Sequence, residues 1–177
     1  MQAFVLTGTR VGIRRPVEAD CGEFLEMVNS SRQLHAPWVD PPSTREKFLE
    51  YLERRRGPVD DGFLVCEIAS GKIAGVINLN NIVRGAFLSA YLGYYAHAAF
   101  AGRGLMAEGI MLVARVAFGE MGLHRLEANI QPGNVASIAL VRGCGFRREG
   151  FSPRYLKVAG EWRDHERWAV LTEEARE

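Results

Sequence analysis

The run Ala99-Phe-Ala-Gly-Arg-Gly-Leu-Met-Ala-Glu108 constrains the fold more than any other part of this 177-residue chain. Gly102 and Gly104 lie where an extended segment gives way to a long helix-forming segment. Glycine adopts backbone angles that residues with a Cβ avoid, and it lets another group approach the main chain closely. A glycine-rich turn that opens a helix directs several free N–H groups, and the positive end of the helix dipole, toward one point. The run therefore predicts a phosphate seat formed by main chain, without a lysine.

Apolar periodicity and turn residues predict the order strand, two helices, three-stranded meander, helix, strand, helix and closing hairpin. Strands are expected at 4–14, 63–68, 73–83, 87–95, 126–130, 151–158 and 162–171. Helices are expected at 20–30, 43–56, 105–121 and 136–142, with Ser43 and Glu46 as a capping box for the second and a loop at 35–42. This order predicts an α/β sheet of mixed direction with helices on its faces. The step across 87–130 implies a parallel pair, which places the glycine turn at the carboxyl end of a central strand, where open α/β sheets bind ligands.

Charge and cysteine usage narrow the partners and the compartment. A net charge of +1 argues against nucleic-acid recognition by bulk electrostatics. The run Arg54–Arg56 is either a solvated helix end or a patch that meets RNA or the 3′-phosphate of a cofactor, and whether it contacts a ribosome stays open. Cys21, Cys66 and Cys144 lack paired or zinc-ligand spacing, which favours a reducing compartment and no metal site. Without a signal-peptide pattern or an apolar run of bilayer length, we expect a cytoplasmic protein with no membrane partner.

Several motifs follow one another in a specific order. They are Tyr91-Leu-Gly-Tyr94; Gly102-Arg-Gly-Leu-Met106 with Glu108; His124-Arg125; Pro132-Gly-Asn134 with Ser137; Cys144-Gly-Phe146 with Glu149-Gly150; Tyr155-Leu156; and Gly160-Glu-Trp-Arg-Asp-His165. Together they resemble the GCN5-related N-acetyltransferases (GNAT superfamily) over nearly the whole chain, and the last motif is similar to the bacterial ribosomal-protein-alanine N-acetyltransferases. The resemblance implies one domain over 1–177, a GNAT-like α/β fold whose mixed, mostly antiparallel central sheet of about seven strands is flanked by helices.

The resemblance also implies acetyl-coenzyme A (acetyl-CoA) as the donor, with no metal. In such proteins the pyrophosphate rests on main-chain N–H groups of the turn, which here are those of Ala101, Gly102, Arg103, Gly104, Leu105 and Met106. The pantetheine arm would add main-chain bonds beside the strand end formed by Tyr94, Tyr95 and Ala96. Asn134 would bond the same arm, and an N–H near Tyr94 would receive the thioester carbonyl as an oxyanion hole.

The chain departs from the family pattern at two positions. Ala99 replaces the Gln or Arg that usually opens the glycine motif, a small loss because the phosphate contacts come mainly from main chain. Val141 stands where many relatives carry the tyrosine that protonates the leaving thiolate. Ser137 resembles the serine that has this role in the ribosomal-protein subgroup; alternatively it is a helix N-terminal serine that satisfies main-chain groups.

Attack on a thioester needs a neutral amine, so we looked for a base. Glu127, on the strand face of Asn129, is the candidate; alternatively it is a surface or ion-paired strand residue. Arg154 replaces a carboxylate that relatives often carry, and Glu108 is expected to be structural. About a tenth of a free α-amine is neutral at pH 7, against about one lysine side chain in a few thousand. The thin supply of bases therefore favours an N-terminal α-amine as acceptor.

The acceptor side depends on individual residues. Trp38, in a proline-rich loop, either walls the acceptor groove or belongs to the core. Asn80 and Asn81, near a strand end, either offer amides to a peptide or form a turn. Tyr155 and His165 are further candidates near the closing hairpin, although a lone histidine is more often structural.

We predict an N-acetyltransferase that transfers acetyl from acetyl-CoA, by direct attack in a ternary complex, to a protein N-terminus, that of a ribosomal-protein alanine. The protein would be a monomer or homodimer. A small amine (aminoglycoside, polyamine or amino acid) is the alternative acceptor, which a strongly acidic groove would favour. A non-catalytic, ribosome-associated module that binds coenzyme A is the alternative outside the enzymes. A dinucleotide enzyme is disfavoured, because the third glycine of that fingerprint and its later acidic residue are missing.

Overall fold

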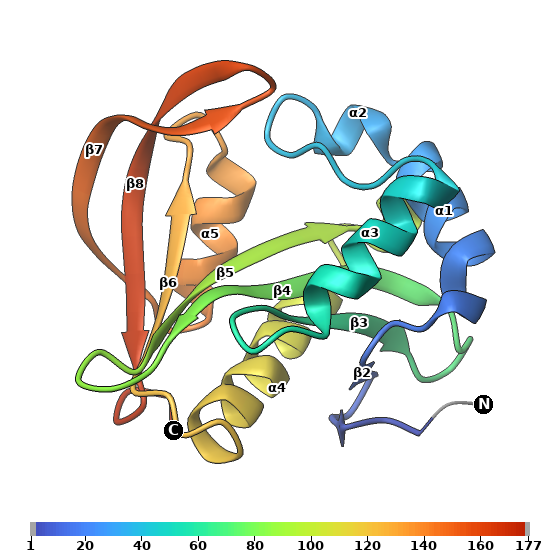
Figure 1. Cartoon of the computed structure of the whole chain (residues 1–177), viewed down its shortest axis with the longest axis horizontal. Coiled ribbons are helices and arrows are strands. Elements are labelled where there is room, and N and C mark those ends of the chain that lie inside the picture. The colour runs from blue at the N-terminus through green and yellow to red at the C-terminus, as the bar shows by residue number, and fades with distance from the viewer. Residues whose placement is uncertain (1–2, 176–177) are drawn as a thin grey trace.

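The computed structural model describes residues 3–175 and is built on an eight-stranded sheet with helices on both faces (Figure 1). The sheet order is β1-β2-β3-β4-β5-β6-β8-β7, in which β5 and β6 run parallel and the other neighbours antiparallel. The strands are β1 (Leu6–Thr7), β2 (Val11–Arg14), β3 (Asp61–Glu67), β4 (Ile73–Val83), β5 (Ser89–Ala96), β6 (Arg125–Ile130), β7 (Arg147–Val158) and β8 (Glu161–Leu171). The helices are η1 (Glu18–Asp20), α1 (Cys21–Ser30), α2 (Arg32–His35), α3 (Arg45–Arg55), η2 (Ala98–Phe100), α4 (Leu105–Gly119) and α5 (Val135–Gly143).

This architecture confirms the expected fold class and differs from the prediction in detail. The first predicted strand, 4–14, is two strands, because the chain turns at 8–10 and the Gly8 N–H donates to the Val11 carbonyl at 2.8 Å. The cap of α3 is Thr44 rather than Ser43, since Thr44 is extended and its Oγ1 accepts from the Lys47 N–H at 3.4 Å. Within residues 3–175, no helix has both the length and the apolarity to cross a bilayer.

Alternate residues of the central strands enter two cores on opposite faces of the sheet. Phe63 and Val65 of β3 belong to the core under α4, whereas Leu64 and Cys66 belong to the core under α1 and α3. We call these the α4 face and the α1–α3 face. Because strand side chains alternate, the register of the sheet fixes the face of every residue that follows.

The sheet opens at its centre. β5 and β6 pair from Ser89↔Arg125 to Tyr91↔Glu127, and beyond that point Leu92–Ala96 pairs with β4 alone and Ala128–Ile130 with β8 alone. One edge of each strand is thus left without a strand partner, and the two strands diverge (Figure 1). The wedge lies at the carboxyl end of β5, just before the glycine turn, which is where the predicted crossover places a ligand site.

Candidate active site

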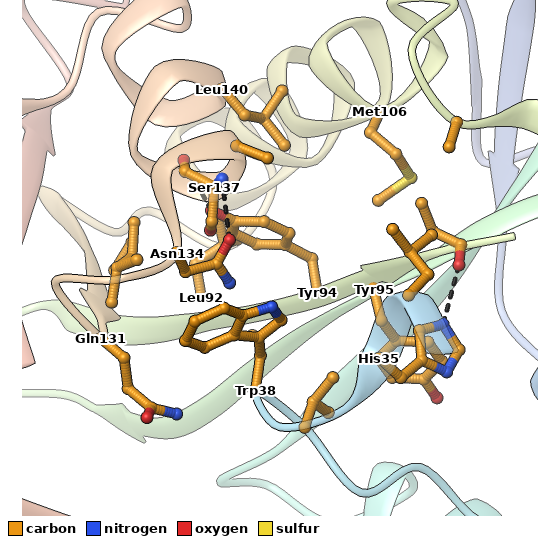
Figure 2. A pocket seen from close by; sticks show the side chains of 18 of the residues that line it. His35, Trp38, Leu92, Tyr94, Tyr95, Met106, Gln131, Asn134, Ser137 and Leu140 are labelled. Atoms are coloured by element: carbon orange, nitrogen blue, oxygen red, sulfur yellow. Dashed lines mark hydrogen bonds between the residues drawn. The ribbon is translucent and has the colours of Figure 1, made fainter. Parts of the chain in front are cut away.

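A cavity of about 570 Å³ occupies this wedge (Figure 2). Its lining includes Tyr94 and Ala128, which face α4, and Tyr95, which faces α1 and α3. Asn129 and His165 also line it; they alternate with Ala128 and Glu166, so they share the face of Tyr95. The cavity is therefore lined from both faces of the sheet.

The glycine turn presents free main-chain donors at one end of the cavity. Gly102 and Gly104 have φ values of 74° and 75°, the left-handed region that favours glycine. Among the described residues, none of the N–H groups from Gly102 to Ala107 has a hydrogen-bond acceptor. Those groups lie at the N-terminus of a 15-residue helix, α4. The arrangement has the donors and the dipole sign that an anion needs.

Arg10 holds this turn from behind. Its guanidinium donates to the Arg103 carbonyl at 2.8 Å and to the Gly104 carbonyl at 3.4 Å. Glu108 in turn accepts from the Arg10 main-chain N–H at 2.8 Å and from Nε at 3.1 Å. Burial opposes ionisation of Glu108, but these hydrogen bonds outweigh it and lower the pKa of its carboxyl. Glu108 is thus the structural residue that the sequence suggested.

A pair of hydroxyl groups meets at the middle of the cavity. The Tyr94 Oη lies 2.5 Å from the Ser137 Oγ and 3.4 Å from the Ser137 carbonyl oxygen. Asn134 caps α5, and its Oδ1 accepts from the Ser137 N–H at 3.1 Å. Burial raises the pKa of Tyr94, so its hydroxyl stays protonated at neutral pH. The pair can therefore donate a proton into the cavity.

Trp38 and His35 close the other side. Figure 2 shows the indole of Trp38 pointing toward Asn134. A Cβ on Gly133 would lie 3.2 Å from its Cη2, so the ring packs directly against the main chain at the start of α5. His35 is 4% exposed, and its Nε2 lies 2.8 Å from the Ala96 carbonyl oxygen. Burial lowers the pKa of His35.

Most of the predicted site residues meet at this cavity. Those that line it are Trp38, Tyr94, Tyr95, Ala96, Ala101, Gly102, Gly104, Leu105, Met106, Asn134 and Ser137. Arg103 lies outside the cavity lining, and its guanidinium lies on the Phe100 ring and pairs with Glu67. The roles given to these residues stay predictions, although the fold brings them together.

Besides Arg103, four predicted residues do not reach the cavity lining: Glu127, Asn80, Asn81 and Tyr155. Glu127 forms an ion pair with Arg125 at 2.9 Å, which matches the alternative interpretation of a paired strand residue. The Asn80 Oδ1 accepts from the Arg55 guanidinium at 2.7 Å, and Asn81 lies in the bulge of β4 with a φ of 50°. Their acceptor roles stay predictions that the geometry does not favour.

Several polar groups of the lining have no counterpart among the predicted site residues: the Tyr94 side chain, His35, Asn129 and Gln131. His165, a candidate beside Tyr155, also lines the cavity. Asn129 was noted only as a neighbour of Glu127, and its Oδ1 is buried without a hydrogen-bond partner. His165 is 3% exposed. Strand alternation was the available signal, since it also predicts which neighbours share a face.

The family model described as "Acetyltransferase (GNAT) domain" matches residues 10–147. The chain belongs to the GNAT acetyltransferases. This GNAT protein is 35% identical to "Probable N-acetyltransferase YjcK" of Bacillus subtilis, over 72% of its own length and 70% of that protein. It is 29% identical to the ribosomal protein uS5-alanine N-acetyltransferase of Escherichia coli, over 94% and 90% of the two chains. Among solved structures it is similar to Mycobacterium smegmatis RimJ in complex with CoA-disulfide, with a TM-score of 0.86 and 26% identity over 94% of this chain and 84% of that chain.

The cavity of this GNAT acyltransferase fits acetyl-CoA, and the structure of Mycobacterium smegmatis RimJ holds coenzyme A as a disulfide. The free N–H groups from Gly102 to Ala107 suit a pyrophosphate, and the unpaired edge Leu92–Ala96 suits an extended amide-bearing arm. When bound, the donor supplies an acetyl group activated as a thioester. Among the described residues, no three His, Cys, Asp or Glu side chains are grouped so as to hold a metal ion.

Proposed function

We propose that this enzyme acetylates the N-terminal α-amine of a protein, that of a ribosomal-protein alanine, by direct attack within a ternary complex. The observation that carries the proposal is the uncharged lining of the cavity. Among the described residues that form it, none is Asp, Glu, Lys or Arg. A polyamine or an aminoglycoside carries several ammonium groups, and removing them from water without a carboxylate partner costs several kcal/mol each. An N-terminal amine is a single group, about a tenth neutral at pH 7.

The apolar side chains around the acceptor end support a small terminal residue. Leu34 and Val39 come from the segment around α2, and Leu156 and Val158 come from β7. Because all four side chains are apolar, a methyl side chain can pack against them without leaving a polar group unpaired. The named activity of the Escherichia coli relative, which covers nearly the whole chain, supports the same acceptor.

The two faces of the wedge divide the substrates. In this proposal the donor lies on the α4 face, beside the glycine turn and α5, and the amine enters on the α1–α3 face, beside Trp38 and the β7–β8 hairpin. Nitrogen attack forms the amide C–N bond and breaks the C–S bond. Ser137, supported by the Tyr94 hydroxyl, supplies the proton for the departing sulfur, and an N–H of β5 near Tyr94 receives the oxyanion.

We also propose a reducing, cytoplasmic setting. Cys21, Cys66 and Cys144 are free and buried, which fits a compartment that keeps thiols reduced. Burial raises the pKa of Cys144 to about 11, so its thiol is no acyl carrier at neutral pH. Of the arginine run, Arg55 is 8% exposed and points inward, which leaves Arg54 and Arg56 as the surface groups for any ribosome contact.

The test uses purified protein, acetyl-CoA and release of the coenzyme A thiol. One peptide begins with alanine and contains an internal lysine; its matched control is the same peptide with the α-amine acetylated beforehand. Spermidine and free lysine complete the panel. We expect turnover with the first peptide and a kcat/KM lower by at least about 10²-fold with every other acceptor. Higher kcat/KM for spermidine or lysine would replace the proposed acceptor with a small amine, and tight coenzyme A binding without any turnover would indicate the binding module.

A further inference from the structure

The cavity contains few groups that can accept a proton. Among the described lining residues, the titratable side chains are those of His35, His165, Tyr94 and Tyr95. Burial raises the pKa of Tyr94 and Tyr95, so both phenols stay protonated and neither is a base at neutral pH. The choice lies between the two histidines, whose ring nitrogens differ in their partners.

The unprotonated nitrogen of His35 is not accessible to a substrate. A carbonyl oxygen can only accept, so the contact between Nε2 and the Ala96 carbonyl at 2.8 Å places the proton on Nε2. The remaining lone pair is on Nδ1, which is fully enclosed and has no partner in the described chain. The ring packs edge-on against Tyr95, with 5.3 Å between ring centroids. An incoming amine cannot reach this lone pair while the ring keeps that position.

His165 has the opposite tautomer. Its Nδ1 lies 2.9 Å from the Arg163 carbonyl oxygen, so Nδ1 carries the proton and the lone pair is on Nε2. Nε2 bonds to no other described residue, yet it is not among the fully enclosed unpartnered atoms, in contrast to His35 Nδ1. The neutral ring thus offers an accessible acceptor nitrogen within the cavity lining.

The hairpin is shaped around this ring. The register between β7 and β8 shifts between Ser152 and Leu156, and Arg154, inside the bulge, has a φ of 46°. The Asp164 carboxylate fixes the bulge by accepting from the Arg154 N–H at 2.7 Å. As a result Tyr155 lies beside the His165 ring, with 6.2 Å between ring centroids. Bulges commonly redirect a side chain next to a site, and here Tyr155 packs against His165 while only His165 lines the cavity.

We propose that Nε2 of His165 is the base that removes a proton from the acceptor ammonium, with the Arg163 carbonyl fixing the tautomer. This inference rests on the proposed function. His165 takes one proton from the ammonium and later releases it to water. The nitrogen of the now neutral acceptor amine then forms the C–N bond as the C–S bond of the thioester breaks. The amine loses a second proton, which passes through Ser137 to the departing sulfur. The sum is one amide, one thiol and one proton released.

The experiment separates this role from a structural one by the choice of variant. In His165→Asn the amide NH₂ replaces Nδ1 as the donor to the Arg163 carbonyl, whereas nothing replaces Nε2. The matched control is His124→Asn, since His124 is half-exposed, pairs with Glu173 at 3.7 Å and lies outside the cavity lining. Each variant is assayed with the alanine peptide and with an analogue whose terminal nitrogen is an aminooxy group, which is unprotonated at neutral pH.

We expect His165→Asn to lower kcat/KM by about 10²–10⁴-fold on the alanine peptide and by less than about fivefold on the aminooxy analogue, with His124→Asn near wild type on both. Equal losses on the two acceptors, or full activity of His165→Asn, would overturn the proposal. If wild-type protein prefers another amine, the proposed function is wrong but the role of His165 is still testable. The kcat/KM of His165→Asn on that amine and on its aminooxy analogue then decides the role of His165. Wild-type protein inactive on every amine would overturn both.

Discussion

The hydroxyl oxygens of Tyr94 and Ser137 lie 2.5 Å apart, one on β5 and the other on α5. Many relatives place a tyrosine at the position of Val141, which here is fully buried in the core under α4. The phenol therefore comes from the opposite wall of the cavity. Because burial raises the pKa of Tyr94, its proton is available to donate to the Ser137 Oγ, which leaves the serine proton free for the departing sulfur.

The hydroxyl pair predicts coupled losses in the rate of acyl transfer. Ser137→Ala should lower kcat by about 10²-fold, and Tyr94→Phe, which keeps the ring, by about tenfold, with little change in coenzyme A affinity. The double variant should lose no more than Ser137→Ala alone, since the tyrosine acts through the serine. Steady-state kinetics and coenzyme A titration check this. Losses that multiply in the double variant would show that the two hydroxyls act independently.

Features set by neighbours in the sequence could be predicted. The glycine turn, the start of α5 at Asn134 and the crossover between β5 and β6 all follow from local turn residues and apolar spacing. The pairing of Tyr94 with Ser137 joins residues 43 positions apart, and their meeting depends on how α5 packs over the wedge. No periodicity reports that kind of contact.

Contacts between residues distant in the sequence also explain why most of the predicted acceptor residues do not meet at the cavity. Asn80 is polar and near a strand end, which is typical of a turn or a ligand contact. Its amide is instead used inside the fold, because α3 brings the buried Arg55 guanidinium within 2.7 Å. The sequence offers His165 as a candidate with a structural role as the alternative, and its tautomer follows only from the Arg163 carbonyl in the folded strand.

Tight binding of coenzyme A should require glycine at the positions of the turn that have a positive φ, such as Gly104. Gly104→Ala places a Cβ at a φ of 75° and 3.2 Å from the Arg10 guanidinium that holds the turn. We expect about 1–2 kcal/mol of lost stability and a coenzyme A dissociation constant raised by tenfold or more. Gly71→Ala, at a φ of 71° with open space around its Cβ, is the matched control for backbone strain. Equal effects of the two variants on the dissociation constant, measured by calorimetry, would contradict the assignment of the turn.

Displacing the Trp38 indole should weaken binding of the acceptor peptide and leave binding of coenzyme A unchanged. Gly133→Ala places a Cβ 3.2 Å from the Trp38 Cη2, so the indole must shift, whereas Gly143→Ala adds a Cβ in open space at the end of α5. We expect Gly133→Ala to raise the KM for the peptide several-fold and to leave the coenzyme A affinity within about twofold of wild type. Gly143→Ala should change neither the peptide KM nor the coenzyme A affinity. An unchanged peptide KM in Gly133→Ala would show that Trp38 belongs to the core alone.

His35 predicts a loss of stability in mild acid. Burial lowers its pKa below 6.5, the value for an exposed ring, so between these two pKa values the unfolded chain binds a proton that the folded chain does not. Stability due to the neutral ring is therefore complete above about pH 6.5 and falls as the pH drops toward the folded pKa, by at most about 1.4 kcal/mol per pH unit.

Urea unfolding of wild type and His35→Gln between about pH 7.5 and 5.5 measures this pH dependence, because glutamine keeps a donor for the Ala96 carbonyl but does not titrate. The stability advantage of wild type over His35→Gln should shrink with falling pH. A difference between wild type and His35→Gln that stays constant across this range would mean that folding does not lower the pKa of His35, contrary to its burial beside Tyr95.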